Sequence, residues 1–226
     1  MSTDRRLIEW PDGPAILENP LIGLDRRRTT IAIAYVLAVV GLFAASYAGG
    51  AVVIDGTPLD TARPSFDTIS AVLIALATAT MLVVPLGYAA WNGGPALSFA
   101  LPLVPVLLAD AATGRYVLDL DVSIALTVGA AACALAVLST DVRRRGTYRP
   151  WRYRSIDENA VLFVTAATIV AGVGVRRFLV TAPAHAREWY LPYGACWLVP
   201  VGILVAYWYG LGTSVANRTG RQSPDR

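Results

Sequence analysis

The stretch Val122 to Thr140, VSIALTVGAAACALAVLST, is 19 residues long and contains no charged side chain. Four other stretches share this property: Thr29 to Ile54, Thr68 to Ala109, Asn159 to Val175 and Trp189 to Asn217. A helix needs about 20 mostly apolar residues to cross a hydrocarbon core roughly 30 Å thick. The 19-residue stretch therefore predicts a membrane-spanning helix, and the five stretches together predict a polytopic membrane protein.

The run from Thr68 to Ala109 has 42 residues, which is about twice the length of one crossing. The segment Trp91-Asn92-Gly93-Gly94-Pro95 lies within it and has residues typical of a turn. We therefore expect two helices joined by a tight hairpin, and six spans in all. The expected fold is all-α, a polytopic transmembrane helical bundle with spans over about 29–50, 68–90, 95–113, 121–140, 158–177 and 190–213.

All 19 basic residues of the chain are arginines, and their distribution predicts the orientation of the bundle. Short loops rich in Lys and Arg stay cytoplasmic. With both termini inside, 14 arginines lie on the cytoplasmic side and 5 outside. The expected parts are a cytoplasmic or interfacial segment over 1–28, a transmembrane domain over 29–214 and a cytoplasmic tail over 215–226. The exclusive use of arginine is typical of a GC-rich genome, so we expect a multi-pass protein of a prokaryotic cell membrane.

The connection between the fourth and fifth expected spans is rich in arginine and aromatic residues. Because it lies beside two helix ends, it predicts contact with anionic lipid headgroups at the cytoplasmic face, or with a partner protein, rather than with nucleic acid. The candidate residues are Arg143, Arg144, Arg145, Arg149, Arg152 and Arg154. The connection ends in Ser155-Ile156-Asp157-Glu158, a capping-box pattern that predicts Ser155 as the N-cap of the fifth helix.

Three ionisable residues fall at the outer ends of expected helices. Asp110 is near the end of the third span, and Arg176 and Arg177 are at the end of the fifth. Ionisable groups at a bilayer boundary either reach out to water or pair with one another. We expect either an ion pair from Asp110 to Arg176 or Arg177, or three side chains that each reach water.

A short motif recurs in the two halves of the chain. Leu103-Val104-Pro105-Val106 is repeated as Leu198-Val199-Pro200-Val201, at an offset of 95 residues. Because each half contains three expected spans, the repeat would be inverted, with Pro105 and Pro200 near the midplane. A proline there frees a backbone carbonyl one turn earlier, and transporters place substrate sites at such broken helices. Ordinary helix kinks are the alternative interpretation.

The chemical inventory excludes several classes of site. The chain contains no lysine, which excludes a Schiff base. His185 is the only histidine, and Cys133 and Cys196 lie in separate expected spans as free thiols, so we expect no metal, haem or other cofactor. No phosphate-binding loop or nucleophile elbow is present. We therefore expect no catalytic residues and no enzyme.

Small residues recur at four-residue spacing in three expected spans, which allows helix backbones to approach closely. They are Gly41, Ala45 and Gly49; Ala71, Ala75 and Ala79; and Ala125, Gly129 and Cys133. The spacing predicts packing faces, either within one chain or between chains.

Two functional classes remain. The first is a non-enzymatic membrane subunit or partner of a larger complex, or a homo-oligomer, which predicts a dry interior and an exposed small-residue face. The second is a small secondary transporter or permease with a midplane site near Pro105 and Pro200. That class predicts a polar cavity, for which Thr78, Thr80 and Ser98 are the candidate lining residues. Hydroxyls bonded to their own helices are the plainer expectation for those three.

Overall fold

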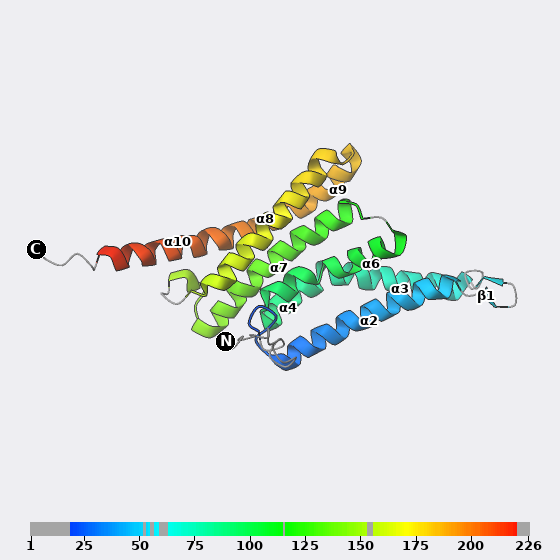
Figure 1. Ribbon diagram of the computed structural model, residues 1–226, viewed down its shortest axis with the longest axis horizontal. Coiled ribbons are helices and arrows are strands. Elements are labelled where there is room, and N and C mark those ends of the chain that lie inside the picture. The colour runs from blue at the N-terminus through cyan, green and yellow to red at the C-terminus, as the bar shows by residue number, and fades with distance from the viewer. Residues whose placement is uncertain are drawn as a thin grey trace, which may run out of the picture.

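The computed structural model describes residues 19–51, 53–54, 57–58, 63–114, 116–152 and 156–220. This part of the chain is helical except for one pair of two-residue antiparallel strands, β1 (Val53–Ile54) and β2 (Thr57–Pro58) (Figure 1). The helices are α2 (Arg26–Ala51), α3 (Arg63–Leu82), α4 (Val84–Asn92), α5 (Pro95–Ala100), α6 (Leu103–Thr113), α7 (Leu120–Arg145), α8 (Glu158–Thr181), α9 (Ala184–Gly194) and α10 (Leu198–Gly220). Two short 3-10 turns, η2 (Pro150–Arg152) and η3 (Ala195–Trp197), complete the described elements. The expected helical architecture is confirmed.

Helix α7 is the centre of the bundle, with α4, α5, α8, α9 and α10 packed around it (Figure 1). Of its most apolar stretch, 78% is buried, compared with 17% for α2. Its small residues explain this position, because they let neighbouring backbones come close. A Cβ atom added at Gly129, for example, would lie 2.8 Å from the Phe99 carbonyl oxygen on α5.

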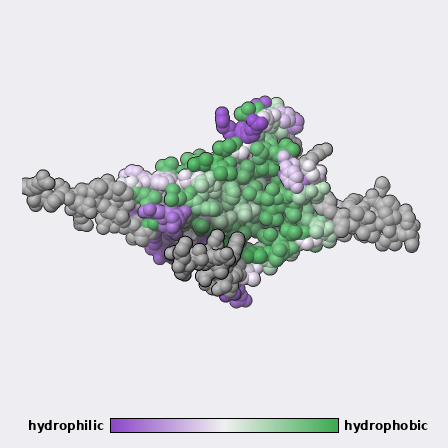
Figure 2. Space-filling view, in the orientation of Figure 1, coloured by the Kyte–Doolittle hydropathy of each residue, from purple (hydrophilic) through white to green (hydrophobic). Residues whose placement is uncertain are grey.

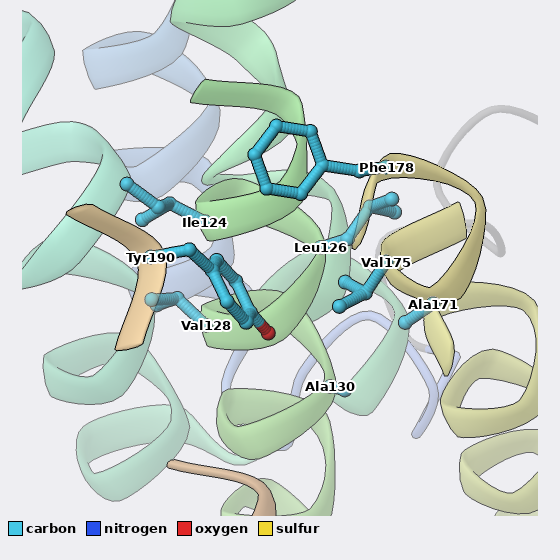
Figure 3. Packing of buried hydrophobic residues seen from close by; sticks show 8 residues of the cluster. All are labelled: Ile124, Leu126, Val128, Ala130, Ala171, Val175, Phe178 and Tyr190. Atoms are coloured by element: carbon cyan, nitrogen blue, oxygen red, sulfur yellow. The ribbon is translucent and has the colours of Figure 1, made fainter. Parts of the chain in front are cut away.

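One apolar cluster joins α7 to α8 and α9 (Figure 3). The rings of Phe178 on α8 and Tyr190 on α9 meet edge to face, with centroids 5.9 Å apart. A second cluster further along α7 includes Tyr207 of α10, which is 1% exposed. The two clusters tie the second half of the chain to the central helix by close van der Waals contact.

Four described helical segments are long and apolar enough to cross a membrane: Arg26–Ser46, Leu120–Arg145, Glu158–Thr181 and Ala184–Thr213. The segments Ser70–Leu82 and Val84–Asn92, bent by 46° where they meet, form a fifth if they are counted as one span. Apolar helices of membrane-spanning length, as expected from the sequence, are therefore present. The expected number of six is not confirmed.

Prolines explain why the second and third expected spans are not continuous helices. Pro85 lies in the first turn of α4, where it lacks the N–H that would bond Met81 and its ring clashes with that carbonyl. In the third expected span, over 95–113, α5 ends at Ala100 and α6 begins at Leu103, so this segment is divided into two helices at Pro102. At 1.5 Å per residue, the 11 residues of α6 extend only about 16 Å.

The hairpin expected at Trp91 to Pro95 is confirmed, and it holds part of the amino-terminal segment. Gly93 and Gly94 have φ angles of 73° and 68°, which glycine adopts without steric cost. The Ala96 N–H donates to the Leu21 carbonyl oxygen at 2.8 Å, and the Leu24 N–H donates to Asn92 at 3.0 Å. The segment just before α2 is thus built into the bundle by backbone hydrogen bonds.

Aspartates begin two of the long helices of the second half, α7 and α8. The Asp119 carboxylate accepts a hydrogen bond from the Val122 N–H and caps α7, and Asp157 does the same for α8 through the Ala160 N–H. Asp157 is therefore the N-cap of α8. Ser155, which the capping-box pattern predicted as the N-cap, lies outside the described residues.

Candidate functional site

The two ends of the bundle differ in charge. Arg28 at the start of α2 and Arg143 near the end of α7 meet at the carboxyl end of α4, which we call the basic end. Asp110, Asp119 and Asp121 meet at the opposite end, between α6 and the start of α7. Figure 2 shows hydrophilic patches separated by a broad hydrophobic surface, as expected for a protein whose middle lies in lipid.

A buried polar cluster closes the basic end. The Asn92 side-chain nitrogen donates to the Thr29 hydroxyl at 3.0 Å and to the Tyr88 hydroxyl at 2.9 Å, and all three residues are almost fully buried. The Asn92 side-chain oxygen accepts from the Asp25 N–H at 3.0 Å, and the Tyr88 hydroxyl donates to the Ile22 carbonyl at 2.6 Å. Because these groups satisfy one another, the cluster fixes α2 and the amino-terminal segment to α4.

Two arginines converge on one backbone carbonyl beside this cluster. Nη1 of Arg28 and Nη1 of Arg143 both donate to the Trp91 carbonyl oxygen, from 2.5 and 2.8 Å. The Arg28 guanidinium also lies over the Trp91 indole, 5.2 Å from the ring centroid. Arg143 is further held by Ser139, whose carbonyl and hydroxyl oxygens accept from Nε and Nη2. Both cations suit the negative end of the α4 dipole.

A second network of charged groups lies inside the bundle. The Asp141 carboxylate, 6% exposed, accepts a hydrogen bond from the Tyr207 hydroxyl at 2.8 Å and lies 3.6 Å from Arg145. Arg145 donates to the Pro150 carbonyl at 2.7 Å, which fixes the start of the connection between α7 and α8. Asp141 belongs to no motif in the sequence, and only its position near the end of a long apolar run marks it.

The arginines expected to form one contact surface are therefore divided among different roles. Arg145 faces inward to Asp141, whereas Arg143 reaches Trp91. Arg144 is exposed and lines a cavity of about 380 Å³ beside the start of α8. Arg149 and Arg152 are exposed, and Arg154 lies outside the described residues. Arg28, which no pattern in the sequence marks for this site, lies beside Arg143.

At the end of the bundle opposite the basic end, which we call the acidic end, Asp110 lies near other carboxylates. Together with Asp119 and Asp121 it lines a cavity of about 490 Å³ between α2, α3, α6 and α7. Arg176 and Arg177 are exposed on α8, which packs on another side of α7. Among the ion pairs found for described residues, none joins Asp110 to either arginine. The pairing proposed from sequence has no support in this geometry, and the alternative of side chains that reach water stays a prediction.

The two prolines of the repeat lie in different surroundings. Pro105 lines the cavity at the acidic end, whereas Pro200 is buried in the first turn of α10 and lines none of the described cavities. The Leu101 carbonyl, freed by Pro105, accepts from the Val104 N–H at 3.3 Å. The corresponding Cys196 carbonyl accepts from the Leu198 N–H. Both carbonyls are thus engaged in tight backbone turns.

The hydroxyls considered for a polar cavity have different surroundings. Thr80 donates to the Leu76 carbonyl at 2.7 Å and contacts the Tyr35 hydroxyl at 2.6 Å. Ser98 is buried and donates to the Gly93 carbonyl at 3.3 Å. Thr78 alone of the three lines the cavity that contains Pro105. Bonding to a carbonyl of the same helix, the plainer expectation, is confirmed for Thr80, whereas the partner of Ser98 is a carbonyl of the hairpin before α5.

The small-residue faces divide into one that is buried and two that are exposed. On α7, Ala125, Gly129 and Cys133 are buried against other helices of the same chain. On α2, Gly41 and Ala45 are exposed, and a Cβ atom added at Gly41 would meet no atom within 4 Å. Ala71 and Ala75 on α3 are also exposed, and Ala79 is partly buried. The exposure of Gly49, the third small residue on α2, is outside what the structure describes.

Within the described part of the chain, no group of three or more His, Cys, Asp or Glu side chains is placed to hold a metal ion. The cysteines Cys133 and Cys196 are both free thiols. The fold and the paired polar groups define a class: a helical protein whose apolar helices are compatible with a membrane. In comparisons with known proteins, no family model matches the sequence, and no curated protein or solved structure matches the chain.

Proposed function

We propose that this protein is a non-enzymatic, multi-pass subunit or partner of a larger complex in a prokaryotic cell membrane, with both termini and the basic end in the cytoplasm. The observation that supports it is the exposed small-residue face of α2 at Gly41 and Ala45. Among the described residues, most buried polar side chains have partners inside the chain, so this part of the interior offers few groups for chemistry or for a polar solute.

The exposed face suits helix association in a membrane. Helices in lipid associate by close packing rather than by a hydrophobic driving force, and small residues allow that packing. Helix α2 is 17% buried over its most apolar stretch, so most of its surface is available to a second helix. The cluster of Thr29, Tyr88 and Asn92 fixes its starting end, which gives a partner a rigid face to bind.

Extraction of the tagged protein from its native membrane in mild detergent, followed by sizing and mass spectrometry, tests the proposal. We expect a stoichiometric partner protein or a homo-oligomer. The variant Gly41→Leu should lose that association with an unchanged unfolding temperature, because the added side chain meets no atom of its own chain. Gly202→Leu on α10 is the matched control, because a Cβ atom added at Gly202 also meets no atom within 4 Å. This variant should keep the association. A lone monomer, or equal loss in both variants, contradicts the proposal.

The proposed orientation predicts which loops an impermeant thiol reagent reaches in intact cells. Tyr116 and Tyr148, 76% and 86% exposed, lie in connections at opposite ends of α7. In a background with Cys133 and Cys196 replaced by alanine, we expect Tyr116→Cys to react in intact cells and Tyr148→Cys to react only after lysis. The reverse pattern would place the basic end outside and overturn the orientation.

One observation favours a second candidate, a small secondary transporter or permease. The cavity of about 490 Å³ contains Pro105 and Thr78 and has carboxylates at one side, as a solute site near a broken helix would. Pro200 does not line this cavity, so the candidate transport site contains Pro105 alone of the two prolines. A protein that extracts alone and accumulates a solute in proteoliposomes would support this candidate instead of the first.

A further inference from the structure

We propose that Arg28 and Arg143, beside the Trp91 indole, form a binding site for a phosphate group at the basic end of the bundle. An anionic lipid headgroup or free phosphate can supply such a group. The inference goes beyond the proposed function, because it holds whether or not the protein has a protein partner.

The guanidinium groups of Arg28 and Arg143 lie close together. Both Nη1 nitrogens donate to the same Trp91 oxygen, from 2.5 and 2.8 Å, so they can be no more than about 5.3 Å apart. A phosphate group, even in a diester, has at least two unesterified oxygens, so two guanidinium groups at this separation can bond to it at once. Arginine pairs of this kind bind phosphate through charge-assisted hydrogen bonds.

The Arg28–Arg143 pair has more positive charge than the carboxylate beside it neutralises. Like charges this close repel unless a counter-charge is present. Among the described residues, the carboxylate found beside the pair is Asp25, whose Oδ2 atom is 3.8 Å from Arg28 Nε. Its Oδ1 atom already accepts from the N–H groups of Arg27 and Arg28. Asp25 thus pairs with Arg28 alone of the two arginines, and the site has an excess positive charge.

Both arginine side chains of the site are fixed before any ligand binds. Arg143 donates to Ser139 through Nε and Nη2, and Arg28 is held by the Trp91 ring. Each guanidinium has five N–H donors, so both retain donors beyond those used here. Fixing the side chains in advance reduces the entropy lost on binding.

The site lies at the ends of apolar helices, where lipid headgroups are expected. Trp91 is 45% exposed and the Arg28 side chain 39% exposed, at the end of apolar helices where α2 begins and α4 and α7 end. Tryptophan favours the level of lipid headgroups, and basic residues there attract anionic lipids. A single cation would satisfy the α4 dipole, so capping alone does not require two arginines at one carbonyl.

The test uses the full chain, purified in a maltoside detergent that contains no phosphate. Phosphatidylglycerol, inorganic phosphate and an uncharged glycolipid are titrated in separate arms, and binding is measured by native mass spectrometry and by the unfolding temperature. The variants Arg28→Gln and Arg143→Gln remove one side of the site each. Arg27→Gln and Arg144→Gln change the net charge equally at exposed neighbouring positions and are the matched controls.

We expect phosphatidylglycerol to bind the native protein, and each site variant to weaken binding about tenfold, the loss expected for one charged hydrogen-bond partner. The two controls should stay within about twofold, because they keep both arginines of the site. If inorganic phosphate binds with the same variant dependence and phosphatidylglycerol does not bind, the site is confirmed and its ligand is free phosphate. Arg143→Lys, which keeps the charge, serves if a glutamine variant does not fold, and it should retain part of the binding.

Two results would overturn the proposal. Equal weakening by the site variants and the controls would show a diffuse basic surface without a defined site. Absence of binding in both the phosphatidylglycerol and phosphate arms, or equal binding of the uncharged glycolipid, would exclude recognition of a phosphate group. Neither result bears on whether a partner protein extracts with the chain, so the two proposals fail separately.

Discussion

Replacement of Gly94 by alanine is expected to lower the free energy of unfolding by about 2–4 kcal/mol, from left-handed strain and overpacking together. Gly94 has a φ of 68°, and a Cβ atom there would lie 1.9 Å from the Ile22 carbonyl oxygen and 2.4 Å from its carbon. Because these are backbone atoms, the amino-terminal segment must move away from the hairpin. Thermal unfolding of the purified protein in detergent, followed by circular dichroism, measures the loss.

Two other glycines separate the causes of this effect. Gly114 has a φ of 65° but no atom within 4 Å of an added Cβ, so Gly114→Ala should cost only the conformational strain, about 1 kcal/mol. Gly87 is helical and equally open, so Gly87→Ala should be stabilising by up to about 1 kcal/mol. If Gly94→Ala were no more destabilising than Gly114→Ala, the close packing of the amino-terminal segment on the hairpin would be wrong.

The features that the sequence predicts correctly depend on neighbouring residues. The hairpin at Trp91 to Pro95 was predictable because its two glycines follow one another, as the positive φ angles there require. The apolar runs were equally readable, because a span is a local property of composition. The number of spans was not, because Pro85 and Pro102 break helices whose hydropathy alone is continuous.

The sites were less predictable because their residues are far apart in the chain. The spacing of basic residues indicates where arginines meet the membrane surface, but not that Arg28 and Arg143 share the Trp91 carbonyl. That contact depends on how α2 and α7 pack on either side of α4. Likewise, nothing local in the sequence indicates that the Tyr207 hydroxyl turns inward to Asp141, 66 positions away.

The Asp141 network leads to the other large expected effect. The variant Asp141→Ala should lower the free energy of unfolding by about 3 kcal/mol, because it removes the counter-charge of a buried arginine and a buried hydrogen-bond acceptor. The Asp141 and Arg145 side chains are only 9% and 13% exposed, so water cannot replace the lost carboxylate easily. Tyr207→Phe removes only the donor to Asp141 and should cost about 1–2 kcal/mol.

The control is Tyr209→Phe on the same helix. Tyr209 is 71% exposed, so its variant should change stability by no more than about 0.5 kcal/mol. Combining Tyr207→Phe with Asp141→Asn should cost less than the sum of the single variants, with a coupling of about 0.5–3 kcal/mol, because both remove the same contact. Strict additivity in thermal unfolding would mean that the two groups do not interact. The connection between α7 and α8 would then be held by other contacts, among them the Arg145 bond to Pro150 and apolar packing.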